Sequence, residues 1–97
     1  MIYRLIPSKI FLKQIEKLDS HSKQIIKDKI ELIKQNPFRF KKIYSKRFSR
    51  VFRIRFSINK KEIRLIYVVA KPNVILVCLL DRKRDYIDLE KYLKKIL

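Results

Sequence analysis

Residues 51–58 alternate strictly between apolar and polar side chains, which predicts a strand with one buried face. The apolar positions are Phe52, Ile54, Phe56 and Ile58, and the positions between them are Arg53, Arg55 and Ser57. Successive side chains of a strand point to opposite faces, so the apolar set lies on one side of a sheet. The chain is therefore predicted to fold around a sheet whose apolar face is covered by other elements.

Two further strands are predicted at residues 62–70 and 74–80, joined by a turn at Pro72-Asn73. The second is apolar on both faces and is therefore expected to be central. A two-residue turn at Asn59-Lys60 would place Arg55 opposite Arg64, Arg53 opposite Ile66 and Ser57 opposite Glu62.

Helices are predicted both before and after these strands along the chain. Residues 2–6 form an opening strand, and Ser8 caps a helix with apolar residues at 11, 15 and 18. Asp19-Ser20 ends that helix and caps a second one, which has isoleucines at 26, 30 and 33 and stops at Asn36-Pro37. A short C-terminal helix carries the stripe Tyr86, Leu89, Leu93 and Ile96.

The predicted order of elements is β-α-α-β-β-β-α, in a single domain spanning residues 1–97. This is an α+β fold in which an N-terminal strand and a helical hairpin pack on a mostly antiparallel, twisted sheet.

The net charge of +17 on 97 residues favours an acidic partner, because like charges repel one another within the compact state. Nucleic acid is the favoured partner, and an anionic membrane surface or an acidic protein is the alternative. Residues 39–55 hold eight basic side chains and no acidic one, with aromatic residues between them. The RNA-binding candidates in this stretch are Lys41, Lys42, Lys46, Arg47 and Arg50.

Other classes of protein are disfavoured by what the sequence lacks. The longest apolar run has 7 residues, and a membrane helix needs about 20. The start of the chain lacks the pattern of a signal peptide, so we expect a cytoplasmic protein. One Cys and one His make a metal site of the Cys/His type hard to build, and no cofactor is expected. Cys78 is interpreted as buried filler and His21 as a surface or cap residue.

Three arginines form the first candidate site. Arg55 opposite Arg64, with Arg53 on the same face, destabilises a hairpin but suits a phosphate, because guanidinium groups offer paired donors and a permanent charge. The alternative is that these arginines only solubilise an exposed sheet face, with Glu62 as a pairing partner. A second cluster, residues 81–86, offers Arg82 as a further phosphate contact and Tyr86 for stacking or proton transfer. Tyr86 is equally well explained as a core anchor of the last helix.

These segments resemble the RelE/ParE toxin superfamily. The matching residues are Phe52-Arg53-Ile54-Arg55, then Ile63-Arg64-Leu65-Ile66-Tyr67, then the strand that runs into Asp81-Arg82-Lys83-Arg84-Asp85-Tyr86. Departures from the usual pattern are the lack of any Gly in the loop before Arg64 and the Asp81 that replaces a frequent His. Arginine also replaces the lysine of some ribonuclease members, and an arginine is a poor general base because its pKa exceeds about 12.

The resemblance implies the toxin of a type II toxin–antitoxin pair that cuts mRNA on the ribosome without a metal. It implies catalytic roles for Arg53, Arg55, Arg64, Arg82 and Tyr86, with the ribosome, mRNA and an acidic antitoxin similar to RelB as partners. Two alternatives stay open: a ParE-like toxin that inhibits DNA gyrase by binding, and a non-catalytic RNA-binding protein.

Overall fold

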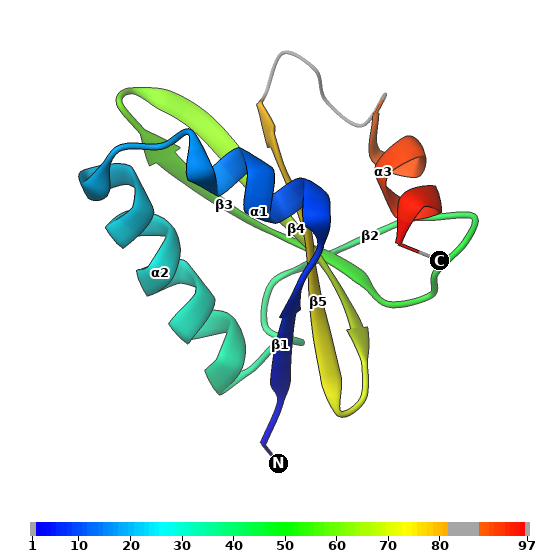
Figure 1. Cartoon of the computed structure of the whole chain (residues 1–97). Helices are drawn as coiled ribbons and strands as arrows, with labels where there is room; N and C mark the ends of the chain where they lie inside the picture. The colour runs from blue at the N-terminus through cyan, green and yellow to red at the C-terminus, as the bar shows by residue number, and fades with distance from the viewer. Residues whose placement is uncertain (1, 82–87, 97) are drawn as a thin grey trace.

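The computed structural model describes residues 2–81 and 88–96, which form an α+β fold (Figure 1). Its elements in chain order are β1 (Arg4–Pro7), α1 (Lys9–Glu16), α2 (Ser20–Gln35), β2 (Lys41–Ile43), β3 (Val51–Ile58), β4 (Lys61–Ala70), β5 (Asn73–Asp81) and α3 (Leu89–Lys95). The sheet order is β1-β5-β4-β3-β2, and every neighbouring pair is antiparallel except β1 and β5. The predicted fold class and the central position of β5 are confirmed.

The predicted order of elements lacked one strand, β2. It contains only Lys41, Lys42 and Ile43, and it pairs with β3 from Lys41 opposite Arg53 to Ile43 opposite Val51. Three residues with two adjacent lysines show no apolar alternation, so the sequence carries no signal for this strand. The strand exists because the outer edge of β3 offers it backbone hydrogen bonds.

The predicted register of β3 and β4 is confirmed at every named pair. Arg55 lies opposite Arg64, Arg53 opposite Ile66 and Ser57 opposite Glu62. The turn residues Asn59 and Lys60 both have positive φ, at 50° and 68°. Two consecutive residues of this conformation form the type I′ turn, whose twist matches that of the paired strands. Asparagine tolerates it well, and its use explains how a turn without glycine forms here.

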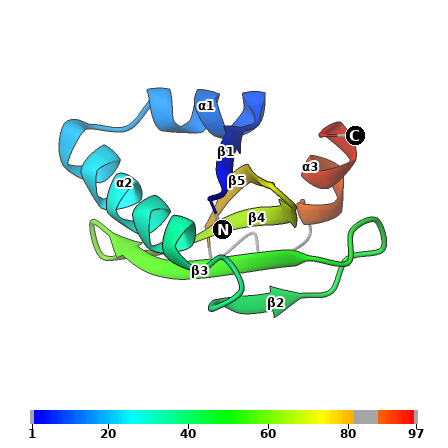
Figure 2. The same cartoon turned by 90° about the horizontal axis from the view of Figure 1, so that it is seen from below.

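Two apolar clusters hold the elements together. The first lies between the sheet and helices α1 and α2; its larger members are Phe11, Ile26, Ile33, Phe52, Phe56, Leu65 and Tyr67. The second lies under α3; its members include Val51, Ile66, Val68, Val77, Leu80, Leu89 and Leu93. Along β3 and β4 the two clusters use alternate residues, so α3 packs on the side chains that point away from the first cluster. Figure 2 shows α2 and α3 toward opposite ends of the sheet.

Helix α1 also completes the edge of β5. Beyond Leu76, where pairing with β1 ends, the Ser8 hydroxyl donates to the Val77 carbonyl at 2.6 Å. The side-chain amide of Gln14 donates to the Leu79 carbonyl at 3.0 Å and accepts from its N–H at 2.7 Å. Polar side chains of the helix thus replace a strand partner, and backbone groups at this edge stay satisfied.

The predicted helix caps are confirmed. Ser8 accepts a hydrogen bond from the Phe11 N–H at 3.0 Å, and Asp19 accepts one from the Ser22 N–H at 2.7 Å. This bond to the backbone N–H of Ser22 lowers the pKa of Asp19. Among the described residues, none of the helices is both long and apolar enough to cross a membrane.

Tyr67→Phe is expected to lower the free energy of unfolding by about 1–2 kcal/mol, because it removes a buried hydrogen bond. The Tyr67 hydroxyl donates to the Pro37 carbonyl at 2.6 Å and joins the end of α2 to β4. The ring would keep its stacking on Phe52, 5.6 Å away between centroids. Urea unfolding measures the change, and Tyr44→Phe is the control because Tyr44 is 82% exposed. An equal midpoint for the two variants would contradict this role of Tyr67.

Candidate functional site

Three predicted site residues lie on one face of the β3–β4 hairpin. Arg55 and Arg64 are cross-strand partners, and Arg53 is two residues from Arg55 on the same strand. Their exposure differs: Arg55 is exposed, Arg53 is half-buried, and Arg64 is buried at 8%. Arg64 is the one charged residue in the described core, so its guanidinium is held in place by its surroundings.

Glu62 supplies a negative charge that reduces the repulsion between Arg55 and Arg64. Its Oε1 lies 3.7 Å from the Arg55 Nε, and its Oε2 lies 3.5 Å from an Nη of Arg64. Directly opposed like charges destabilise a hairpin, and a carboxylate between them offsets that repulsion. The pairing expected under the solubilising interpretation is therefore present, together with the clustering expected of a phosphate site.

A hollow of about 310 Å³ opens beside this face, at the outer edge of β3. Its basic lining residues are Lys29, Lys41, Arg53 and Arg55, and its apolar ones are Leu32, Phe40 and Ile54. The hollow exists because β2 begins at Lys41, opposite Arg53, and leaves the rest of that edge of β3 unpaired by β2. Among the described residues, four cations and no carboxylate line it, so it is suited to binding an anion.

Lys29 is a site residue that sequence reasoning missed. It lies on α2, where lysines mix with acidic residues in the pattern of an ordinary solvated face. In the structure it is half-buried, and its Nζ lies 6.0 Å from the centroid of the Phe56 ring. Only the packing of α2 across β3 brings it to the hollow, so no local sequence signal distinguishes it from the other lysines of the helix.

The predicted RNA-binding residues do not form one patch. Lys41 lines the hollow, and Lys42 is exposed beside it on β2. Lys46 and Arg47 lie between β2 and β3 and contact α3: the Lys46 N–H donates to Glu90 at 3.2 Å, and the Arg47 Nε is 3.9 Å from the same carboxylate.

Arg50 belongs to another group, around the exposed ring of Phe38. Its guanidinium carbon lies 5.7 Å from the ring centroid, and the Lys71 Nζ lies 5.2 Å from it. Phe38 also meets Tyr3 and Phe52 edge-on. Arg50 precedes Val51 at the start of β3, so it is several residues along the strand from Arg55.

Arg82 and Tyr86 lie outside the described residues, so their roles stay predictions. Cys78 is fully buried, as expected, and burial raises its pKa to about 12, with the charge of Asp88 as a smaller cause. A thiol so protonated and enclosed is not a nucleophile. His21 is exposed in the first turn of α2. Within residues 2–81 and 88–96, no three acidic, Cys or His side chains group closely enough to hold a metal ion.

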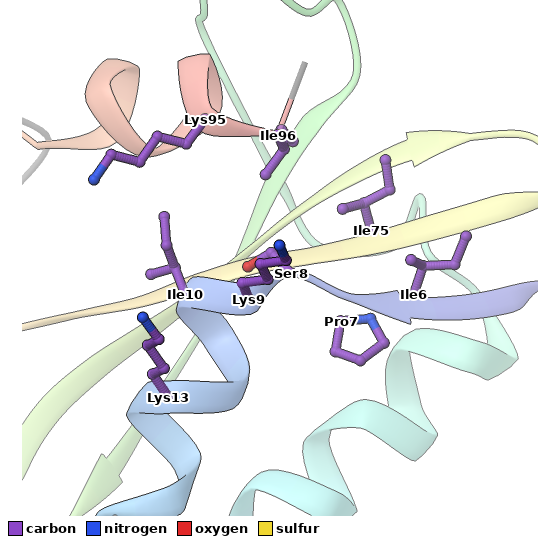
Figure 3. A pocket seen from close by; sticks show the side chains of 9 residues that line it. All are labelled: Ile6, Pro7, Ser8, Lys9, Ile10, Lys13, Ile75, Lys95 and Ile96. Atoms are coloured by element: carbon purple, nitrogen blue, oxygen red, sulfur yellow. The ribbon is translucent and has the colours of Figure 1, made fainter.

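A larger groove of about 570 Å³ lies on another part of the molecule (Figure 3). Ile10 and Lys13 of α1 face Lys95 and Ile96 near the C-terminus across it, over a floor that includes Ile75. None of the predicted site residues that the structure describes lines it. Its lining is apolar with lysines at the rim, which contrasts with the cation-rich hollow beside β3.

Comparisons with solved structures show the same fold in a bacterial toxin. A mutant of the E. coli RelE toxin in the free state matches with a TM-score of 0.76 at 23% identity, covering 100% of both chains. The isolated E. coli RelE toxin matches at 0.67 and 23% identity, covering 98% of this chain and 99% of that one. The intact E. coli RelBE toxin–antitoxin complex matches at 0.63 and 21% identity, covering 79% of this chain and 93% of that one. By sequence, no family model and no curated protein matches. The chain therefore has the RelE fold.

Lys29→Ala is expected to weaken binding of a single-stranded RNA oligonucleotide. The slope of log K against log[salt] is expected to fall in magnitude by about 0.7, which corresponds to the loss of one phosphate contact. Lys27→Ala is the matched control, since it removes the same charge from an exposed position of α2 outside the hollow. Fluorescence anisotropy at several salt concentrations gives both quantities. Equal losses in the two variants would show that net charge, and not the hollow, determines binding.

Proposed function

We propose that this protein is the toxin of a type II toxin–antitoxin pair and that it cuts mRNA on the ribosome without a metal. The observation that carries the proposal is the placement of Arg53, Arg55 and Arg64 on one face of a hairpin in a RelE fold. A hairpin gains nothing in stability from two opposed arginines, whereas a phosphate binds to them.

These arginines would contribute most by stabilising the charge of the transition state. Attack of the 2′-OH on the adjacent phosphate builds negative charge on the phosphorane oxygens, which fixed cations stabilise strongly. Arg64 would be the fixed member, because it is buried, and Arg55 the exposed one. Arg53, at the rim of the hollow, would hold a neighbouring phosphate together with Lys29 and Lys41.

The proton transfers fall to other groups. Arginine stays charged at physiological pH and does not accept the 2′-OH proton. Tyr86 remains the candidate for orienting the substrate or protonating the 5′-oxygen, and Arg82 for a further phosphate contact. The ribosome would supply the remaining alignment of the mRNA, in keeping with a site that is incomplete in the isolated protein.

The separate basic groups suit a large RNA partner. Lys42, the pair Lys46 and Arg47, and Arg50 beside Phe38 are spread over different segments around the sheet. Contacts with ribosomal RNA at several such points would dock the protein while the arginine face meets the mRNA.

We further propose an acidic antitoxin as the partner of the free protein. One of the matching structures is a complex of the E. coli RelE toxin with its antitoxin. The net charge of +17 gives an acidic polypeptide a strong electrostatic attraction to this chain.

The test is cleavage of a short mRNA programmed on 70S ribosomes, mapped by primer extension. The unmodified protein is expected to cut within the A-site codon, and Arg55→Gln is expected to lower the rate by roughly 10²–10³, as for loss of one transition-state donor. Arg55 is preferred to Arg64 for this test because its side chain is 55% exposed and its replacement leaves the core intact.

Arg4→Gln is the matched control, because Arg4 is exposed on β1 at the opposite edge of the sheet. Equal rates for Arg55→Gln and the unmodified protein would overturn the site assignment. No cut by the unmodified protein, on or off the ribosome, would overturn the ribonuclease proposal and turn attention to gyrase inhibition or simple RNA binding.

A further inference from the structure

Glu62 lies between the two guanidinium groups to which the proposed function assigns a phosphate. Its two carboxylate oxygens each meet a different guanidinium, Arg55 on one side and Arg64 on the other. A carboxylate and a phosphate use guanidinium donors in the same way, through paired oxygens. An RNA phosphate that approaches this arginine pair therefore meets donors that are already engaged.

The contacts are loose enough to be exchanged. The two distances are 3.7 Å and 3.5 Å, whereas charge-assisted hydrogen bonds measure about 2.7–2.9 Å. A carboxylate shared between two cations on opposite strands does not reach the best geometry with either of them. An RNA phosphate carries the same single charge on two non-bridging oxygens and is not tethered to β4, so it is able to align with both guanidinium groups.

Exposure shows which partner is able to move. The side chain of Arg64 is 9% exposed, that of Glu62 is 27% exposed and that of Arg55 is 55% exposed. Burial holds Arg64 and the Glu62 Oε2 beside it, while the rest of the Glu62 side chain is partly exposed near the end of the hairpin, opposite the short side chain of Ser57. Rotation of Glu62 toward water would draw its carboxylate away from both arginines.

We propose that Glu62 is an internal competitor for the RNA phosphate: it neutralises Arg55 and Arg64 in the free protein and leaves them when single-stranded RNA binds. This inference rests on the proposed function, because it assumes that the arginine face meets RNA. Glu62 thus makes two opposite contributions: it stabilises the fold, and it lowers the affinity for RNA.

Glu62→Gln tests both contributions at once. We expect its affinity for a fluorescein-labelled single-stranded RNA decamer to rise roughly two- to fivefold, the range that a partly exposed ion pair supplies. The slope of log K for RNA against log[salt] is expected to increase in magnitude by about 0.7, which corresponds to one more phosphate contact. The melting temperature is expected to fall by roughly 2–6 °C, as the arginines lose their counter-ion.

Glu31→Gln is the matched control. It makes the same change of net charge, but Glu31 pairs with Lys34 on α2, 3.9 Å away, and not with the arginine face. A purely structural Glu62 would lower the melting temperature and leave RNA affinity no higher than in Glu31→Gln. That result would overturn the inference.

Titration with inorganic phosphate separates this inference from the proposed function. It needs neither the ribosome nor cleavage, so Glu62→Gln is expected to bind phosphate more tightly even if no mRNA is cut. Unchanged phosphate and RNA affinity in a folded Glu62→Gln would overturn the role of Glu62 while leaving the cleavage assay to decide the function.

If Glu62→Gln does not fold, Glu62→Asp gives the second measurement. It keeps the charge but draws the carboxylate back by one methylene, which weakens its hold on both arginines. A smaller rise in RNA and phosphate affinity is expected, and an equal or lower affinity would overturn the inference.

Discussion

The two-residue turn at Asn59-Lys60 determines where the arginines of the candidate site lie. Both residues have positive φ, and the resulting tight turn fixes which residue of β3 meets which residue of β4. A slip of one residue would send Arg53 and Arg55 into the apolar cluster and expose Phe52 and Phe56. The arginine face and the core therefore share one register, and the tight turn keeps Arg55 opposite Arg64.

That register gives the molecule an uneven distribution of charge. Three described carboxylates lie beside basic side chains: Glu62 between two arginines, Glu90 beside Arg47 and Glu31 beside Lys34. Arg55, one of the four cations that line the hollow beside β3, pairs with Glu62, while Arg50 and Lys71 lie near the ring of Phe38. Basic side chains thus gather where β3 begins and along its outer edge. A polyanion that follows this strand would meet both groups.

The sequence predicted the parts that local rules control. Alternation in residues 51–58, caps at Ser8 and Asp19 and the turn at Asn59-Lys60 each depend on neighbours in the chain, and all are confirmed. Strand β2 and Lys29 were missed because each depends on a distant partner, β3 in both cases. The pairing of Glu62 was foreseen only as an alternative to a phosphate site. The structure shows that one carboxylate is compatible with both, since it compensates the charges that a phosphate would bind.

A site built on paired strands is suited to holding charge. Backbone hydrogen bonds on both sides of β4 and burial of its side chain fix Arg64 before any ligand arrives, so little reorganisation is needed when negative charge develops. Fixed cations need a counter-ion while the site is empty, and Glu62 is near enough to supply it. The same rigidity limits the chemistry, because guanidinium groups hold charge but do not exchange protons at physiological pH. Under the proposed function, arginine at all three hairpin positions would stabilise a phosphorane, and the proton transfers would need residues outside the hairpin or the RNA partner.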